Sequence, residues 1–328
     1  MTIKAIEQML YPIKFEPFLR EMVWGGEKIP PFKGIETPVH HIGESWEISA
    51  VEEHPTCVAE GPLKGLSIKE LVQRYKGGLV GGKVYETYGD TFPLLVKFID
   101  AAADLSIQVH PDDALAAVRH GGQRGKTEMW YVIGAEPGAC LYSGLSREVS
   151  PEELASRAAD GTITEVLARY EVHPGDVFFL PAGRIHAICR GCFVAEIQET
   201  SDLTYRLYDY GRPGLDGKPR QLHTALAMDA IDYRVLPSYR TDYTPVKNTG
   251  VELVSCPYFT TSVYDLDAPL QRDLSRVDSF VVVMCLSGSG AVDDTPIRQG
   301  ETLLIPASSP GVRFLPGPGG MKLLTSHL

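Results

Sequence analysis

The amino-acid sequence predicts a mainly β protein, built as two jelly-roll β-barrels with a small helical insertion. Short apolar runs recur along the chain, and 32 glycines and 24 prolines supply turns between them. One pattern of turn, apolar run and proline also occurs twice. Recurring short strands separated by turn residues are typical of β-sandwiches and β-barrels. A chain of 328 residues is long enough to form two such domains.

The expected strands are seven apolar runs, each between seven and ten residues long. Some alternate apolar and polar residues, and others are apolar throughout, as in strands buried on both faces. Gly, Pro, Asp or Ser stands at an end of nearly all of them, which is where turns begin. They lie at residues 92–100, 104–111, 128–134, 176–183, 192–199, 279–288 and 301–308.

Helices are expected to interrupt these strands. Ser67 and Glu70 have the spacing of a capping box before the segment LVQRY. Ser150 followed by Pro151 is a strong helix start, with serine as N-cap and proline in the first turn. The expected helical segments lie near residues 66–76, 150–170 and 221–231.

A change of composition marks the expected domain boundary. Residues 234–250 are rich in Pro, Tyr and Thr and show no periodicity. The pattern GDVFFLPAG at 175–183 recurs beyond this stretch as GETLLIPAS at 300–308, as expected for two copies of one barrel plan. We therefore predict an N-terminal domain of residues 1–235 and a C-terminal domain of residues 236–328, with a loose tail after Gly320.

Composition limits the function classes. The formal net charge is −11, with no cluster of Lys or Arg. Nucleic acids and anionic membranes both need a basic surface, so neither is an expected partner, whereas a few local cations could still hold a small anion. No run of 18 apolar residues occurs, and the N-terminus lacks a signal-peptide pattern. We therefore expect a cytoplasmic protein.

The six cysteines include a CxxC formed by Cys189 and Cys192. A redox pair and half of a zinc site are alternative interpretations of this spacing. No second CxxC exists to complete a four-cysteine zinc site. Because apolar strand-like residues stand on both sides, the favoured interpretation is two reduced thiols that flank a hairpin turn.

Four residues form a candidate metal site. A strand over 104–110 places Gln108 and His110 on the same face, because side chains alternate along a strand. In VHPGDVFFLPAGRIHAI, a Gly-Asp turn, a buried strand and a Pro-Ala-Gly turn lead to His186. This spacing resembles the second cupin motif, while Gln108-Val109-His110 and Glu128 stand in place of the first. The simpler alternative is a hydrogen-bonded glutamine and histidine in the core.

The chemistry of these four side chains fits a catalytic metal. Two imidazoles, one carboxylate and one amide oxygen suit Zn²⁺, and Mn²⁺, Fe²⁺, Co²⁺ or Ni²⁺ could also be held. The remaining histidines, His223 among them, have no metal-like spacing and are expected to be structural or on the surface. In the second copy of the pattern Gly311 stands at the position of His186, so the C-terminal domain is expected to bind no metal.

Four blocks in order, SIQVHPDD, KTEM, the motif of His186 and ETSDLTYRLYDYGR, together resemble the type I mannose-6-phosphate isomerases, or phosphomannose isomerases, in their short bacterial form. The resemblance covers about residues 12–210 by motifs. It implies a cupin enzyme with one Zn²⁺ per chain, held by Gln108, His110, Glu128 and His186. It also implies an aldose–ketose isomerase, monomeric or homodimeric, that interconverts mannose 6-phosphate and fructose 6-phosphate through a metal-stabilised cis-enediolate.

The resemblance further implies roles in the pocket. Arg206 matches the family's catalytic arginine, and Lys126 matches an active-site lysine that would also bind substrate. Lys97 and Ser106 match positions near the substrate, and Glu196 matches an acid of the pocket. Arginine stays protonated and is a poor base. The general base is therefore Lys126, Glu196 or a metal-bound water, and the sequence does not choose among them.

Simpler interpretations and other functions remain open. Lys126 could be a phosphate anchor or an ion-pair partner, and Arg206 could form a structural ion pair with Asp202 or Asp209. The alternative functions are a non-haem metal cupin oxygenase and a sugar-binding cupin without catalysis. Gln108 in place of a histidine argues against the oxygenase. A binding protein would not need Lys126 and Arg206 beside its metal.

Overall fold

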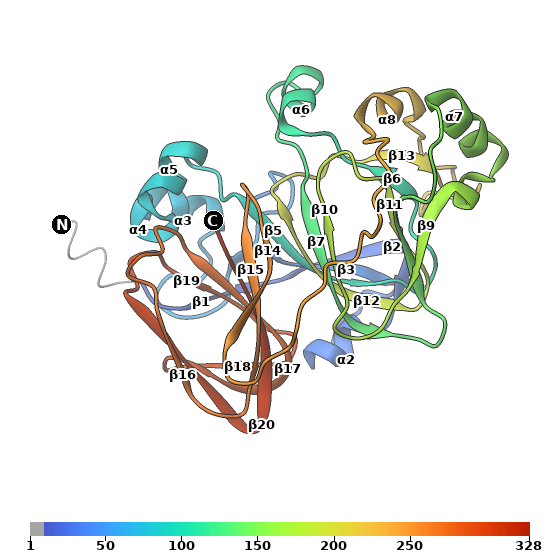
Figure 1. Ribbon diagram of the computed structural model, residues 1–328. Coiled ribbons are helices and arrows are strands. Elements are labelled where there is room, and N and C mark those ends of the chain that lie inside the picture. Colours follow the sequence, from blue (N-terminus) through green and yellow to red (C-terminus); the bar gives the residue numbers. More distant parts are fainter. Residues whose placement is uncertain (1–9) are drawn as a thin grey trace.

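The computed structural model describes residues 10–328. The first nine residues lie outside the described residues. They are part of the N-terminal segment in which the sequence shows no signal-peptide pattern. Within the described part the protein is mainly β, as predicted, with strands in three largely antiparallel sheets and helices at their edges (Figure 1). None of the helices in residues 10–328 is long and apolar enough to cross a membrane.

Two sheets come from the N-terminal part of the chain and hold the candidate site between them. The six-stranded sheet has the order β10-β7-β12-β5-β3-β2 and the five-stranded sheet the order β13-β6-β11-β8-β9. The strands of the first are β2 Phe18–Gly26, β3 Ile42–Ile48, β5 Leu94–Asp100, β7 Glu128–Ala135, β10 Val177–Leu180 and β12 Cys192–Glu199. Those of the second are β6 Ile107–Val109, β8 Cys140–Leu145, β9 Leu167–Glu171, β11 His186–Ile188 and β13 Tyr205–Tyr208.

The central strands of the six-stranded sheet are buried on both faces. Every residue of β5 and β12 is buried, because one face packs on the core shared with the C-terminal part and the other faces the five-stranded sheet. Such strands need apolar side chains on both faces. The charged residues Lys97 and Glu196 break this rule, since they lie in the middle of β5 and β12. Charges in such places require partners.

The C-terminal sheet also contains strands from the start of the chain. Its order is β14-β15-β20-β17-β19-β1-β4, with β16 beside β20 and β18 beside β17. The domain boundary near residue 235 stays a prediction, but β1 and β4 show that the first 235 residues contribute two strands here. The bounds are β1 Ile13–Glu16, β4 Cys57–Val58, β14 Gly250–Ser255, β15 Thr260–Leu266, β16 Leu270–Asp273, β17 Val281–Val292, β18 Thr295–Arg298, β19 Thr302–Ile305 and β20 Gly311–His327.

The tail after Gly320 is not loose, and that expectation was wrong. It forms the second half of β20, which pairs with β15 from Thr260↔His327 to Leu266↔Met321. Leu323 and Leu324 are buried in this strand. Alternation of apolar residues over so short a terminal segment gives little local indication of a strand, and pairing with two distant strands stabilises it.

The expected helices are present, and four others within residues 10–328 were not expected. α3 Ile68–Tyr75 begins with the capping box of Ser67 and Glu70, and α7 Pro151–Asp160 begins at the N-cap Ser150. The rest of the 150–170 segment holds only the short 3₁₀ helix Ile163–Val166 and the strand β9. The helix near 221–231 is α8 Thr224–Ala230. The additional helices are α2 Ile29–Lys33, α4 Gly77–Val80, α5 Gly82–Tyr88 and α6 Asp113–Arg119, all too short to show periodicity.

The repeated sequence pattern has the same local structure in both places. Gly175 and Gly300 both have a positive φ, 98° and 81°, and each precedes a strand, β10 and β19. At Gly300 an added Cβ would lie 2.7 Å from the Cα of Lys33, so glycine is required there by space as well as by backbone conformation. The turn at Cys189–Cys192 also matches its prediction, because β11 ends at Ile188 and β12 begins at Cys192.

Candidate active site

Three strands carry the candidate metal donors to one place. His186 begins β11 and lies directly opposite Gln108 of β6, and His110 follows β6 by one residue. Gly183 makes this approach possible, since its amide donates to the His110 carbonyl at 2.9 Å. A Cβ at Gly183, whose φ is 86°, would lie 2.9 Å from the carbonyl oxygen of Ala230. Glu128 begins β7 in the facing six-stranded sheet.

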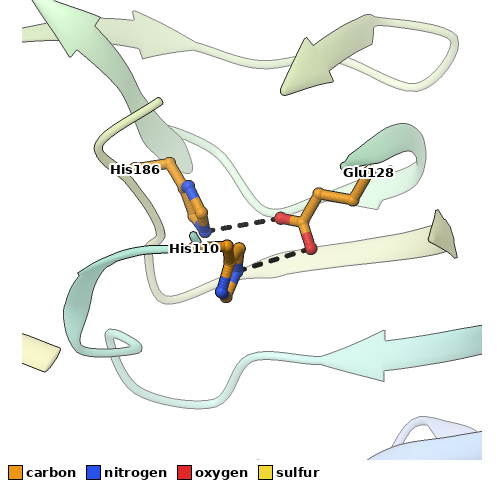
Figure 2. Close-up of side chains that lie close together, drawn as sticks. All are labelled: His110, Glu128 and His186. Atoms are coloured by element: carbon orange, nitrogen blue, oxygen red, sulfur yellow. Dashed lines mark ion pairs between the residues drawn. The ribbon is translucent and has the colours of Figure 1, made fainter. Parts of the chain in front are cut away.

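His110, Glu128 and His186 point toward one another (Figure 2). The Nε2 atom of His186 lies 3.3 Å from one carboxylate oxygen of Glu128, and that of His110 lies 3.6 Å from the other. Their donor atoms all lie within 4.8 Å of one another, and this is the one such group among residues 10–328. All three side chains are at most 2% exposed.

The tautomers of the two histidines suit metal binding. Each Nδ1 lies 2.8 Å from a backbone carbonyl oxygen, that of Leu203 for His110 and that of Arg184 for His186. Nδ1 must therefore carry the proton, which leaves the Nε2 lone pairs directed at the centre of the group. Burial lowers the pKa of His110 well below its usual value and that of His186 to about 3, so both rings are neutral.

The carboxylate also fits this site. Burial and the nearby Glu196 raise the pKa of Glu128 to about 7, against the effect of Lys126. Its Oε1 atom is buried and has no hydrogen-bond donor among the described residues. An unpaired buried carboxylate oxygen is costly. The carboxylate and the two neutral imidazoles beside it form a suitable donor set for a divalent metal.

Gln108 lies beside this group as its fourth member. Its amide nitrogen is 3.4 Å from the Nε2 atom of His186, and its amide oxygen accepts from the Ser106 hydroxyl at 3.2 Å. Rotating the amide by 180° would present the oxygen to the centre, since the two ends of an amide have the same shape. Its role as a metal ligand stays a prediction.

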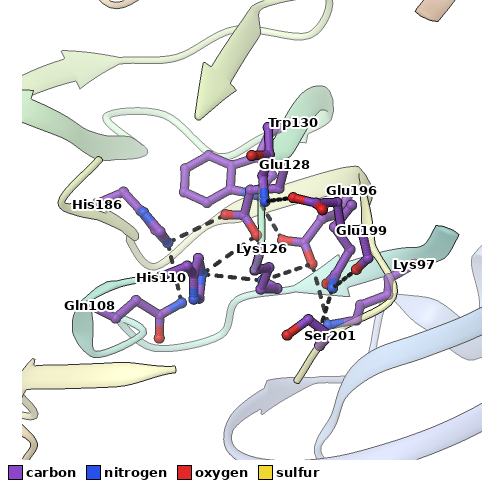
Figure 3. Close-up of polar contacts among 12 residues, drawn as sticks. Lys97, Gln108, His110, Lys126, Glu128, Trp130, His186, Glu196, Glu199 and Ser201 are labelled. Carbon is purple, nitrogen blue, oxygen red and sulfur yellow. Dashed lines mark hydrogen bonds and ion pairs between the residues drawn. The ribbon is translucent and has the colours of Figure 1, made fainter. Parts of the chain in front are cut away.

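Lys126 lies against the metal group (Figure 3). Its ammonium contacts a carboxylate oxygen of Glu128 and lies 3.2 Å from the Nε2 atom of His110. It also lies 3.8 Å from the carboxylate of Glu196 and is 4% exposed. Lys126 is thus a buried cation in contact with two of the candidate metal donors.

A row of charged and aromatic side chains crosses four strands next to Lys126. Strand pairing places Lys97 opposite both Trp46 and Glu196, and places Glu196 opposite Trp130. Lys97 lies 3.3 Å from Glu196 and 3.6 Å from Glu44. Register alone thus brings these side chains, distant in the sequence, to one level of the sheet.

Each carboxylate of this row accepts from an indole N–H. Trp130 donates to Glu196 at 2.8 Å and Trp46 donates to Glu44 at 2.5 Å. Burial alone would raise the pKa of Glu196, but Lys126, Lys97 and the Trp130 bond lower it to about 2. Burial alone would lower the pKa of Lys97, but Glu44 and Glu196 raise it above its usual value. Both groups are therefore charged near neutral pH.

Arg206 lies on β13, paired with Gln108 of the neighbouring strand β6. Its Nε donates to the Ser106 hydroxyl at 3.2 Å, and one terminal nitrogen donates to the Gln221 carbonyl at 3.0 Å. Its backbone amide donates to Nδ1 of His223 at 3.2 Å. Arg206 forms no ion pair among the described residues, so the alternative of a structural pair with Asp202 or Asp209 is not favoured.

A second arginine, Arg220, lies beside Arg206. Arg220 donates two hydrogen bonds, of 2.7 and 2.5 Å, to the carboxylate of Asp209, which also pairs with Arg212. Burial and the charge of Arg220 lower the pKa of Arg206. The single negative charge of Asp209 thus neutralises one of the three positive charges of Arg206, Arg212 and Arg220. This corner of the pocket therefore carries excess positive charge.

A cavity of about 210 Å³ adjoins the metal group, although His110, Glu128 and His186 are not among its lining residues. The residues assigned to the pocket by resemblance, Lys97, Ser106, Lys126, Glu196 and Arg206, all face it, and so does Gln108. Several other lining residues were not predicted from the sequence, and His223 was expected to be structural or on the surface. These residues are Arg20, Trp130, Thr204, Arg220 and His223.

Comparison with family models matches residues 13–129 to the catalytic domain of type I phosphomannose isomerase. Two curated proteins of Bacillus subtilis are similar over nearly the whole chain. The putative mannose-6-phosphate isomerase YvyI is 35% identical over 323 residues, 97% of this chain and 99% of the relative. The mannose-6-phosphate isomerase ManA is 34% identical over 327 residues, again 97% and 99%.

Solved structures share the same fold. The crystal structure of mannose 6-phosphate isomerase from Bacillus subtilis has a TM-score of 0.87 at 33% identity, over 97% of this chain and 100% of that chain. The structure of a putative mannosephosphate isomerase from Archaeoglobus fulgidus has a TM-score of 0.78 at 23% identity, over 97% and 98%. The second likeness concerns the fold alone.

Proposed function

Since the chain belongs to the type I phosphomannose isomerases, with curated relatives 35% and 34% identical over 97% of its length, we propose that it interconverts mannose 6-phosphate and fructose 6-phosphate. The observation that carries this proposal is the cavity of about 210 Å³. Its lining includes Lys126 and Gln108, which contact the His₂Glu metal group, and the two arginines Arg206 and Arg220. A sugar phosphate needs both features, one for its reacting carbonyl end and the other for its phosphate.

The metal is Zn²⁺ in this proposal, held by His110, Glu128 and His186 with Gln108 as the fourth donor. Zinc accepts imidazole nitrogen and carboxylate oxygen readily, and a site without thiolates keeps positions open for substrate. A zinc ion bound there would supply Lewis-acid chemistry at the sugar carbonyl.

Lys126 is the group we assign to proton transfer. Isomerisation moves a proton between C2 and C1 of the open-chain sugar through a cis-enediolate. Glu196, whose pKa is lowered to about 2, is a weak base near neutral pH, because a good catalytic base has a pKa close to the working pH. Lys126 lines the cavity and, as a neutral amine, would take the proton from C2 and return it to C1.

Lys97 and Arg206 are fixed cations in this proposal. Lys97 has three N–H donors, and its ion pairs with Glu44 and Glu196 leave it able to donate to a sugar oxygen. Arg206 is oriented by Ser106, Gln221 and His223. Preorganised donors of this kind stabilise the negative charge that develops on the enediolate.

A coupled assay tests the proposed function. Purified protein with Zn²⁺ should form fructose 6-phosphate from mannose 6-phosphate, lose this activity with a chelator and regain it with added Zn²⁺. Oxygen consumption with bound iron and no isomerisation would instead indicate a cupin oxygenase. Sugar-phosphate binding without turnover would indicate a sugar-binding cupin, and either result would refute the proposal.

Arg220 is expected to bind the phosphate together with Arg206. Arg220→Gln should raise KM for mannose 6-phosphate roughly 10- to 100-fold with little change in kcat, because a hydrogen bond to a charged group contributes about 1.5–3 kcal/mol. Steady-state kinetics with mannose 6-phosphate measure this directly. Arg212 still pairs with Asp209 in this variant, which limits structural damage. A fall in kcat at unchanged KM would place the phosphate elsewhere.

A further inference from the structure

Two cysteines outside the pocket face each other across neighbouring strands. Cys140 begins β8 and Cys189 directly follows β11. The antiparallel register runs through Ala187↔Tyr142 and Ile188↔Leu141, so the next pair is Cys189 with Cys140. The Cys189 amide donates to the Cys140 carbonyl at 3.1 Å, which continues the ladder by one step.

Their side chains point to the same side of the sheet. Directly opposed residues of an antiparallel pair share a face, with Cα atoms about 5.5 Å apart in a hydrogen-bonded pair. Disulfides span Cα separations of about 4.4–6.8 Å, so the backbone spacing suits a bond. Ile188 lines the pocket, and because strand side chains alternate, Cys189 lies on the face away from it.

The surroundings of Cys140 favour its thiolate. Arg169 lies on the same outer face, since it pairs with Tyr142 across β8 and β9. The Cys189 thiol and, against burial, Arg169 lower the pKa of Cys140 to about 7. Cys57 and Cys256 are more exposed than Cys140, but burial raises the pKa of both. The thiolate is the reactive form of cysteine, so Cys140 should react first.

The CxxC partner, Cys192, lies in a different environment. It is fully buried in the cluster between the two N-terminal sheets, and its thiol donates to the Cys140 carbonyl at 3.2 Å. Burial raises the pKa of Cys192 to about 12. The sequence spacing alone would pair Cys189 with Cys192, whereas the register of β8 and β11 pairs Cys189 with Cys140.

We propose that Cys140 and Cys189 form a peroxide-reactive thiol pair that closes to a reversible cross-strand disulfide. The Cys140 thiolate attacks one oxygen of hydrogen peroxide, which breaks the O–O bond and gives a sulfenic acid and hydroxide. The Cys189 sulfur then attacks the Cys140 sulfur, so that the S–S bond forms and the S–O bond breaks. Overall, the two thiols together lose two electrons and two protons, and these reduce hydrogen peroxide to two water molecules.

Peptide mapping after peroxide treatment tests this site. The reduced, zinc-loaded protein is treated with increasing hydrogen peroxide, blocked with iodoacetamide, digested without reductant and analysed by mass spectrometry. We expect a linked peptide pair containing Cys140 and Cys189 at lower peroxide than any oxidation of Cys57 or Cys256. Dithiothreitol should restore both thiols.

Serine variants separate the two possible pairings. Cys192→Ser should leave the linked pair unchanged, whereas Cys140→Ser and Cys189→Ser should each abolish it. Thermal unfolding of each variant without peroxide confirms that it is folded. A disulfide between Cys189 and Cys192 would overturn the proposal, as would earlier oxidation of Cys57 or Cys256. Isomerase activity plays no part in this readout, so the result is independent of the proposed function.

Discussion

Replacing Lys126 with methionine is expected to lower kcat roughly 10³-fold while the affinity for Zn²⁺ rises. General-base help is worth about 10²–10⁴-fold, and methionine cannot supply it. The ammonium of Lys126 contacts Glu128 and lies 3.2 Å from Nε2 of His110. A dication at the same donors is repelled by this charge, and its removal favours the metal. Isomerase kinetics and zinc titration against a competing chelator measure the two effects.

Lys126→Arg is the matched control, because arginine keeps the positive charge but cannot lose a proton. We expect it to lose turnover as the methionine variant does, without the gain in zinc affinity. Retained turnover in Lys126→Arg would show that Lys126 acts through its charge and does not transfer the proton. Unchanged zinc affinity in Lys126→Met would show that its contacts with His110 and Glu128 do not oppose metal binding.

The candidate metal donors could be found from the sequence because their pattern is local. Gln108 and His110 differ by two positions on one strand, and His186 follows a turn whose residues, such as Gly183, require a special backbone. Turn chemistry and strand period act over a few residues, so they are visible in one sequence. Glu128 had to be added through the likeness to the first cupin motif, because its approach from the facing sheet depends on the tertiary fold.

The arginine corner shows what one sequence does not contain. Arg220 and His223 belong to the irregular segment between β13 and α8, where no periodicity indicates which side chains face inward. His223 reaches Arg206 through a backbone hydrogen bond in the fold. Trp130 was visible only as a strand residue, and its bond to Glu196 depends on the β7–β12 register. Long-range register of this kind cannot be read from local propensity.

The same difference between local and long-range features decides which parts of the fold were predictable. Buried strands such as β5 and β12 are largely apolar runs and were correctly expected. β1 was not expected to join the C-terminal sheet, because its pairing with β19 connects residues nearly 300 positions apart in the sequence. Such contacts arise from burial of one common core, which includes Ile13 and Leu304. Because of these contacts, the first strand of the chain cannot be assigned to a sheet from its own sequence alone.

Replacing His186 with alanine is expected to remove the metal and abolish isomerisation. The substitution deletes one of the two neutral imidazoles, the one whose Nε2 atom lies 3.3 Å from the Glu128 carboxylate. Loss of a residue that only hydrogen-bonds to a metal ligand costs roughly 10–100-fold in metal affinity, so loss of a ligand itself should cost at least about 100-fold. Zinc content after dialysis, measured by mass spectrometry, and the coupled isomerase assay report the two losses.

His120→Ala provides the matched control for this substitution. His120 is a half-buried histidine whose ring makes one hydrogen bond, 2.7 Å to the Tyr205 hydroxyl, and it is not part of the metal group. Its removal should leave the zinc content and KM close to those of the unaltered protein. Full zinc occupancy in His186→Ala would show that the donor set is wrong. If zinc were lost while isomerisation persisted, the metal would serve the fold, and proton transfer by Lys126 would proceed without Lewis-acid help.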